Sequence, residues 1–233
     1  MGAALLVEYY RRMPNRRAKD DADTWRRRQE EGRQKFLALA QSRYTEGTLV
    51  RLLENGAARS RRAALLALGQ LGGIDANPII AAHLKDDDTE ARRLAADALW
   101  ALWFRADDEN NTEELQRLMR VRDREKAVAG LDRLLQKAPN FAEAYNQRAI
   151  HYFKMKQFER SIADCEKTLQ LNPYHFGAMA GMAQSYMQMR KHKAALKAFR
   201  TALRINPNLD GVAETIRALE NALGEEGRKD DKK

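Results

Sequence analysis

The stretch "LQLNPYHFGAMA", residues 169–180, decides the fold of this chain. It ends one apolar segment, places Asn172 and Pro173 at the end of that segment, and then begins a new run of small and apolar residues. Proline has no backbone N–H to donate and does not continue a helix. The stretch therefore predicts the end of one helix followed closely by the start of another.

The same helix stop occurs three times. The other copies are "LLQKAPNF" at 134–141 and "LRINPNL" at 203–209. Their prolines, Pro139, Pro173 and Pro207, are evenly spaced, because 173 − 139 = 34 and 207 − 173 = 34. A unit of that length exceeds an ordinary globular helix. Equal spacing therefore predicts repeated units of two short helices each.

The interiors of the two complete units agree when residues 142–175 are set over residues 176–209. Large residues recur at one set of positions and small residues at another. The equivalent pairs are Tyr145 and Met179, Ala149 and Ala183, Tyr152 and Tyr186, Ser161 and Ala195, Cys165 and Phe199, Thr168 and Ala202, and Leu169 and Leu203. Small residues at matched positions allow two helix backbones to approach closely. We therefore expect two packed helices in each unit.

This pattern resembles the tetratricopeptide repeat, which has an aromatic, a small residue, a Tyr, an Ala, a Phe and a closing Pro in a fixed order. The resemblance covers residues 142–209, and a weaker unit precedes it with Ala127, Leu131 and Pro139 in register. Arg148 departs from the pattern, which has a Leu there, and neither complete unit has the Gly of the first helix. The resemblance implies an array of two and a half units.

The residues after Pro207 predict a terminal helix. Within "NLDGVAETIRALENALG" the apolar residues are four, three and four apart, at Val212, Ile216, Leu219 and Leu223. A stack of repeats leaves its last apolar face open, so a capping helix is expected there. We expect the array with its cap to span residues 107–224, and residues 225–233 to form a disordered charged tail.

A second self-similarity lies upstream, with a spacing of 31 residues between matched positions. Leu49 falls on Ile80, Leu53 on Leu84, Arg61-Arg62 on Arg92-Arg93, Ala64 on Ala95, and Leu68 on Leu99. This segment resembles HEAT repeats of the short type found beside phycobilisome-lyase-type proteins, which have an acidic loop followed by Arg-Arg-x-Ala-Ala. The resemblance covers the HEAT-like repeats expected at residues 45–106; it does not imply lyase activity, and many such repeats are scaffolds. The chain is thus expected to be an all-α, right-handed α-solenoid, with a HEAT-like pair followed by a tetratricopeptide array.

The first 44 residues form a basic N-terminal segment. Residues 1–62 hold 15 Lys/Arg against 8 Asp/Glu, a net charge of +7 in a chain of +9. The segment "DADTWRRRQEEGRQKFLALAQ" predicts one helix, capped by Asp23 or Thr24. A basic patch of this kind can bind nucleic acid or an anionic membrane. The alternative interpretation is a solvated helix face.

Two further features concern the cellular setting. Cys165 is the only cysteine, so no intramolecular disulfide can form, which suits a reducing, cytoplasmic location. No run of about 18 apolar residues is present, so no membrane span is expected. The opening "MGAALLVEYYRR" reads poorly as a signal peptide. Its abrupt start leaves open the alternative that this chain is a fragment of a larger membrane-tethered assembly factor.

The sequence contains no constellation of catalytic or metal-binding residues. The four histidines, none of them three or four residues from another His or Cys, are His83, His151, His175 and His192. Cys165 occupies a core position, where a small buried hydrophobe is expected. The run Asp86-Asp87-Asp88 is interpreted as an exposed loop between helices rather than a cation site. We therefore expect no enzyme activity, no catalytic residue, no cofactor and no metal.

The resemblance also implies a binding groove lined by the first helix of each unit. Carried over by register, the lining residues are Glu143, Asn146, Ile150, Phe153, Lys154, Ala180, Gln184, Met187 and Gln188. Phe153 and Met187 are equivalent, and Ile150 lies near them, so they are candidate apolar anchors for a partner. The alternative is that the capping helix covers some of them.

The functional hypothesis is a non-catalytic protein-binding scaffold or adaptor that takes a peptide or a helix in the concave groove. Relatives that hold the C-terminal carboxylate of chaperones place Lys and Arg where this chain has Gly177 and Gly181, so that clamp is not expected. Nucleic-acid binding by the basic N-terminal helix is the alternative function. The sequence leaves the oligomeric state open.

Overall fold

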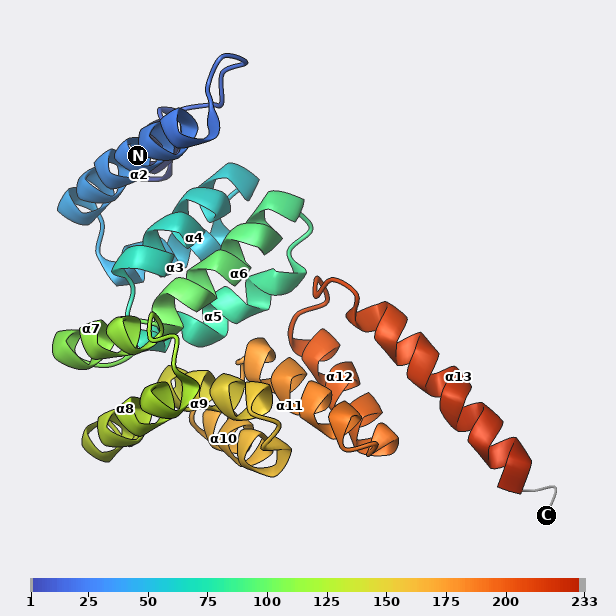
Figure 1. The fold of residues 1–233 in the computed structure, drawn as a ribbon. Coiled ribbons are helices and arrows are strands. Elements are labelled where there is room, and N and C mark those ends of the chain that lie inside the picture. Colours follow the sequence, from blue (N-terminus) through green and yellow to red (C-terminus); the bar gives the residue numbers. More distant parts are fainter. Residues whose placement is uncertain (1, 231–233) are drawn as a thin grey trace. The chain divides into compact units, whose positions relative to one another are not determined.

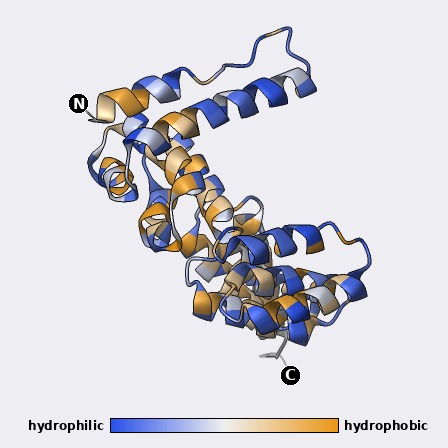
Figure 2. Ribbon diagram, turned by 90° about the vertical axis from the view of Figure 1, so that its left-hand side faces the viewer, coloured by the Kyte–Doolittle hydropathy of each residue, from blue (hydrophilic) through white to orange (hydrophobic). Residues whose placement is uncertain are grey.

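The computed structural model describes the backbone of residues 2–230 and the side chains of residues 3–224. Every regular element in these residues is a helix, and they contain no strand, which confirms the all-helical prediction (Figure 1). The chain divides into two compact units, Met1–Leu102 and Trp103–Lys233. Apolar and hydrophilic stretches alternate along the helices, as expected for elements that bury one face (Figure 2). The two units are described separately.

The first unit contains six α-helices within its described residues. They are α1 (Gly2–Arg11), α2 (Ala22–Arg43), α3 (Glu46–Asn55), α4 (Ala58–Leu71), α5 (Asn77–Ala82) and α6 (Thr89–Trp103), with 3-10 turns η1 (Ile74–Ala76) and η2 (His83–Lys85) on either side of α5. Helices α1, α2 and α3 all pack against α4. Leu6, Phe36 and Leu68 are among the residues that form the buried core of this unit.

Two local features of this unit concern a helix cap and a close helix contact, and the cap differs from the expectation. Asp21, rather than Asp23 or Thr24, caps α2, because its carboxylate accepts the N–H of Thr24 at 2.7 Å. Helices α4 and α6 approach closely at Gly69, where an added Cβ would lie 2.7 Å from the Cα of Ala98. A side chain larger than hydrogen at residue 69 would therefore separate these two helices.

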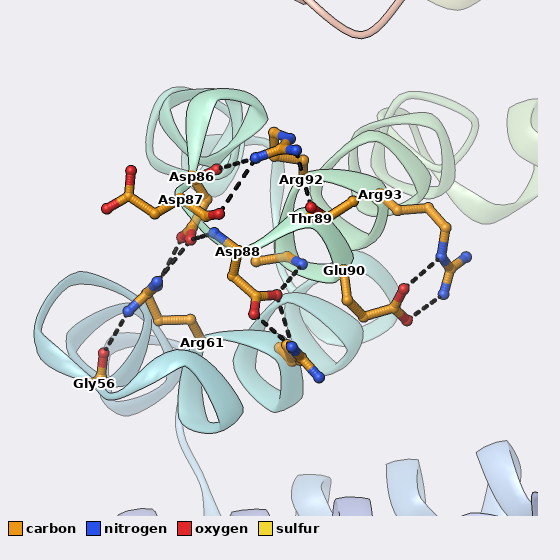
Figure 3. A network of polar contacts seen from close by, with 11 residues as sticks. Gly56, Arg61, Asp86, Asp87, Asp88, Thr89, Glu90, Arg92 and Arg93 are labelled. Atoms are coloured by element: carbon orange, nitrogen blue, oxygen red, sulfur yellow. Dashed lines mark hydrogen bonds and ion pairs between the residues drawn. The ribbon is translucent and has the colours of Figure 1, made fainter.

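The acidic loop before α6 is held by arginines of α4 (Figure 3). Arg61 donates from Nε to Asp86 Oδ2 at 2.7 Å and from Nη2 to Oδ1 at 2.6 Å. Arg62 donates from Nε to Asp88 Oδ1 at 2.8 Å, and the same oxygen accepts the N–H of Ala91 at 2.7 Å. The loop is therefore bound to the preceding helix pair.

This network changes the interpretation of the acidic run. Asp86 is only 9% exposed, so the expectation of an exposed loop is wrong for this residue, while Asp87 is exposed. Hydrogen bonds from Arg61 lower the pKa of Asp86, and Arg62 does the same for Asp88. These carboxylates stay ionised because arginines neutralise them.

The second unit contains seven α-helices from Glu109 to the end of the described residues. They are α7 (Glu109–Leu118), α8 (Arg124–Lys137), α9 (Ala142–Lys154), α10 (Phe158–Leu171), α11 (Phe176–Gln188), α12 (His192–Ile205) and α13 (Val212–Asp230). Each helix packs against the next one along the chain, and α9 also contacts α11 (Figure 1). Contacts between sequence neighbours of this kind define a solenoid.

The repeated helix stops have a common local structure. Asn172 Oδ1 accepts the N–H of Tyr174 at 3.1 Å, and Asn206 Oδ1 accepts the N–H of Asn208 at 3.0 Å. Both asparagines are buried. An Asn side chain that bonds the backbone two residues on mimics a turn. The first stop has Ala138 at this position and lacks that side chain.

The matched small residues lie in the core, as the register predicts. Ala149 is 1% exposed, while Ala183 and Ala195 are fully buried. Ser161, which replaces an alanine, is also buried, and its hydroxyl accepts a hydrogen bond from Ser185 at 3.1 Å. The hydroxyl therefore has a partner, which offsets the cost of burying it.

Arg148 occupies the position where the repeat pattern has a leucine. Its Nε and Nη2 atoms each donate to the carboxylate of Asp164 at 2.7 Å, and Nη1 donates to Asp132 at 2.7 Å. Its guanidinium also lies 5.4 Å from the ring centre of Tyr145 and 5.8 Å from that of Tyr152. Hydrogen bonds to Asp164 raise the pKa of Arg148. A polar link thus joins α8, α9 and α10 where a leucine would pack.

The capping helix α13 begins at Val212, as expected, and packs against α12. Its Leu219 is 3% exposed, and Ile216 also packs against the core of the last unit. Residues 225–230, expected to be disordered, continue α13 to Asp230. The remainder of that expected tail, residues 231–233, lies outside the described residues.

Candidate functional site

A groove in the second unit lies between α9, α11 and the start of α13. Its cavity has a volume of about 430 Å³. Helices α9 and α11 contribute Phe153, Gln184, Met187 and Gln188. The other wall is formed by Phe199 of α12, by Asp210 and Gly211, and by Val212 and Thr215 of α13.

The cavity brings together four of the nine residues expected to line the groove. Phe153 and Met187 are equivalent residues of consecutive units, since 187 − 153 = 34, and both line this cavity. Gln184 and Gln188 lie one helical turn apart on the same wall and are exposed. The repeat register therefore places equivalent side chains along one groove.

Three more expected residues lie on the same two helices, outside the residues that line the cavity. Ile150 is 37% exposed, which is high for a large aliphatic side chain. Lys154 is exposed at the C-terminal end of α9. Ala180 is half-buried on α11. An apolar residue and a cation thus extend the surface along α9.

Glu143 and Asn146 belong to the interior instead. The side chain of Glu143 is fully buried, and Asn146 is 3% exposed. Glu143 Oε1 accepts hydrogen bonds from Asn146 at 3.0 Å and from Gln147 at 2.6 Å. A buried carboxylate requires such donors, because it has lost its water. These two residues are therefore not free to contact a surface ligand, and their expected role in the groove is corrected.

The same carboxylate contacts His175, which lies in the turn before α11. The distance from His175 Nε2 to Glu143 Oε2 is 2.8 Å, and His175 Nδ1 accepts the N–H of Ala178 at 3.0 Å, which caps α11. Because Nδ1 acts as an acceptor, Nε2 carries the ring proton and donates it to Glu143. The indole of Trp103 stacks on the imidazole with ring centres 4.1 Å apart. This cluster links α9 to the turn before α11.

The capping helix both covers and completes the groove. Met187 packs in the same cluster as Val212, Ile216 and Leu219, so α13 covers part of its side chain. The sequence did not predict that residues at the start of α13 line the cavity. The signal was present, because 176 + 34 = 210 places residues 210–215 in register with the start of α11.

Cys165 and His151 of the second unit both have pKa values shifted by burial. Cys165 is 2% exposed, and burial raises the pKa of its thiol to about 12. Burial has the opposite effect on His151, whose pKa it lowers because it disfavours the charged imidazolium, and the positive charges of Lys154 and Arg124 lower it further. Across the described residues, His, Cys, Asp and Glu form no group of three that would hold a metal ion.

A second cavity, of about 720 Å³, lies in the first unit between its first two helices and the α4–α6 pair. Arginines dominate its lining, and three of them, Arg11, Arg16 and Arg59, make no ion pair with described residues of the chain. Others are neutralised, as Arg93 is by Glu90 at 2.6 Å. The aromatic rings of Tyr10 and Trp25 also line the cavity. This cavity will be called the N-terminal cleft.

The geometry of the second unit defines a helical repeat array with a groove walled by equivalent helices and a cap. The tetratricopeptide repeat family model matches it twice, at residues 142–175 and at residues 177–209. Residues 142–209 therefore consist of two tetratricopeptide repeats, which confirms the prediction from the proline spacing. The matched residues lie in the second unit, and the HEAT-like assignment of the first unit stays a prediction.

Comparison with solved structures finds similar chains. "First TPR of Spaghetti (RPAP3) bound to HSP90 peptide SRMEEVD" is 20% identical, with 50% of this chain and 89% of that chain covered and a TM-score of 0.43. The first TPR domain of the human RPAP3 protein is 20% identical over 50% of this chain and 91% of that chain, with a TM-score of 0.45. The Hsp90 co-chaperone Cns1 from Saccharomyces cerevisiae is 23% identical over 53% and 41%, with a TM-score of 0.45.

No protein among the curated sequences matches this chain. Among the described residues, no helix combines the length and the apolar character needed to cross a bilayer.

Proposed function

We propose that this chain is a non-catalytic adaptor that binds an extended peptide or a helix of a partner protein in the groove of its second unit. The observation that carries the proposal is the cavity lined by Phe153 and Met187, equivalent residues of two tetratricopeptide repeats. Its volume of about 430 Å³ lies in the range of ligand pockets, roughly 300–1,000 Å³. Phe153, Met187 and the exposed Ile150 are the apolar anchors.

The polar residues at the groove set the orientation of the ligand. Lys154, Gln184 and Gln188 are exposed and offer adaptable hydrogen bonds. Because the walls are helices held by their neighbours, little ordering of the protein is needed when a peptide binds. The groove therefore acts by shape and apolar contact, without a chemical step.

A peptide-display selection tests this function. The full chain is immobilised, a random peptide library is selected on it, and the enriched peptides are synthesised and measured by calorimetry. Phe153→Glu places a charge in the apolar cavity and should weaken binding by about thirtyfold or more, the loss expected for a hot-spot residue. The matched control is Gln170→Glu, which adds the same charge to an exposed position of α10.

Circular dichroism of both variants establishes that they remain folded. The proposal fails if the selected peptides bind the folded Phe153→Glu variant as tightly as they bind the wild type. It also fails if no peptide is enriched above the level of an unrelated immobilised protein.

The N-terminal cleft favours a second candidate function, the binding of single-stranded nucleic acid. Arg11, Arg16 and Arg59, which have no ion pair with described residues, supply contacts to phosphates, and the rings of Tyr10 and Trp25 offer platforms for stacked bases. Arginine also binds phosphate through two N–H groups at once. These residues come from α1, α2 and the turn between them, with Arg59 at the start of α4.

Fluorescence anisotropy with a single-stranded RNA of about 15 nucleotides tests this second function. Arg16→Glu/Arg59→Glu should weaken binding by about tenfold or more, and wild-type affinity should fall steeply from about 50 mM to about 200 mM salt. The control Arg43→Glu/Arg51→Glu changes the net charge equally at exposed positions that do not line the cleft. Equal weakening by both double variants would show a non-specific charge effect and exclude the cleft.

A further inference from the structure

The outer face of α12 is strongly basic. Lys193, Lys197, Arg200 and Arg204 lie four, three and four residues apart, which places them on one side of the helix, and all four are exposed. Arg200 forms an ion pair with Glu220 of α13. The other three make no ion pair with described residues of the chain. Three cations on this face are therefore not neutralised by any side chain that the structure describes.

Helices at the same place in the preceding repeats have the opposite charge. In α10 the residues 34 positions earlier are Glu159, Ala163, Glu166 and Gln170, and in α8 the residues 68 positions earlier are Glu125, Ala129, Asp132 and Gln136. The formal charge of these four positions is −2 in α8, −2 in α10 and +4 in α12. Because the three helices share one fold position, folding does not require the basic face of α12.

An apolar strip runs between these cations. A cavity of about 610 Å³ is lined by the four basic residues, by Leu196 and Leu203 of α12, and by Ile216 of α13. At the positions that match Leu196, the earlier helices have Val128 and Ile162, which are 8% and 9% exposed. Leu196 and Leu203 are half-buried. At the position of Leu196, the last unit thus leaves an aliphatic side chain more exposed than the earlier units do.

We propose that this surface, made of the basic face of α12 with Leu196, Leu203 and Ile216, binds an acidic amphipathic helix of a partner protein. Leu196 and Leu203 are seven residues apart, two helical turns or about 10 Å. A partner helix with apolar residues at the same spacing covers both leucines. Its flanking Asp and Glu side chains meet the cations on either side.

Other occupants fit the surface less well. A second copy of this chain that docks symmetrically, through this same face, presents the same four cations and is repelled. The phosphates of a nucleic acid would pair with the cations but leave the leucines exposed to water. A membrane surface is flat, whereas the leucines line a cavity. Only an acidic helix satisfies both the charges and the apolar strip.

Two synthetic peptides of about 18 residues provide the test, with Leu at helical spacing and either Glu or Lys at the flanking positions. The full chain should bind the Glu peptide more tightly than the Lys peptide, and the affinity should fall as salt is raised. Lys193→Glu/Lys197→Glu should lower the affinity of the chain for the Glu peptide by about tenfold or more, and Leu203→Asn should lower this affinity also. Phe153→Glu should leave this binding unchanged, which separates it from the groove of the proposed function.

Two control variants sharpen the result. Glu159→Lys/Ala163→Lys places cations at the equivalent positions of α10, where the adjoining Ile162 is buried, and should create no second site. Lys126→Glu/Lys137→Glu lowers the net charge at exposed positions of α8 and should leave the affinity unchanged. Equal weakening by this second control would overturn the proposal.

Vesicles with about 30% phosphatidylserine and a single-stranded RNA serve as alternative ligands. The proposal is overturned if the wild-type chain binds the vesicles or the RNA but not the Glu peptide, and the Lys193→Glu/Lys197→Glu variant loses that binding. It is also overturned if the Glu and Lys peptides bind equally well.

Discussion

At the scale of single residues, Arg148 shows how an exception to a repeat pattern is accommodated. Two aspartates on neighbouring helices hold its guanidinium, and Asp164 is itself buried. The sequence reveals the departure but not the partners, because an ion pair between helices leaves no periodic signal. The contact between Glu143 and His175 could not be predicted from the sequence either. The repeat positions equivalent to His175 hold Phe141 and Leu209, so the histidine is not part of the repeated pattern.

Arg148→Leu restores the leucine of the repeat pattern and should nevertheless destabilise the chain. The substitution leaves the carboxylate of Asp164 buried without its cation, and the loss should be about 2 kcal/mol in the free energy of unfolding, since the site is partly solvated. Urea denaturation followed by circular dichroism measures it. The double variant Arg148→Leu/Asp164→Ala should regain most of the loss. If the single variant matches the wild type, the ion pair contributes nothing to stability.

Cys165 should be inert towards thiol reagents in the folded chain. Burial raises the pKa of its thiol to about 12, so the thiolate is scarce at neutral pH, and the side chain is 2% exposed. Labelling with iodoacetamide, followed by mass spectrometry, should show modification in urea and almost none in buffer. Rapid labelling of the folded chain would contradict the packing of α10.

At the scale of helices, the positions of the repeat helices follow from spacing, and their irregularities do not. Three proline stops locate α8 to α12, and the matched small residues identify the faces that pack. The short α5 lies between two 3-10 turns, and the acidic loop that follows is held by α4 across 25 residues of sequence. Such long-range contacts are invisible to local propensity.

The link between α4 and the acidic loop makes the first unit sensitive to acid. Arg61 holds the pKa of Asp86 below its ordinary value of 3.8, so the ionised pair stabilises the folded chain above about pH 4. That contribution is lost as the pH falls through the lowered pKa of the folded state. Asp86→Asn should therefore lower the urea midpoint at about pH 7, and the difference from the wild type should shrink towards about pH 2. A difference that stays constant with pH would exclude this pair as its cause.

At the scale of the whole molecule, the chain forms two compact units, so a destabilising substitution in one unit should leave the stability of the other unchanged. The basic N-terminal segment and the helix pairs α3–α4 and α5–α6 belong to one unit, and the tetratricopeptide repeats to the other. Local opening follows such cooperative units. The distribution of charge along the sequence does not by itself predict this division, because net charge affects solubility and the choice of partners rather than the fold.

Hydrogen exchange followed by mass spectrometry should show this separation. Arg148→Leu should speed the exchange of amides in α8, α9 and α10 and leave residues 2–102 close to the wild type. Asp86→Asn should have the reverse pattern. Accelerated exchange throughout the chain in both variants would show that the two units open together.

The hydrogen bond between Glu143 and His175 limits how far this array can be trimmed. Repeat proteins are often shortened from one end, because each module depends mainly on its neighbour. Here a chain that stops before His175 would lack the imidazole that contacts Glu143 Oε2 at 2.8 Å. A shortened chain that keeps α9 must therefore also keep His175, the last residue of the repeat matched at residues 142–175.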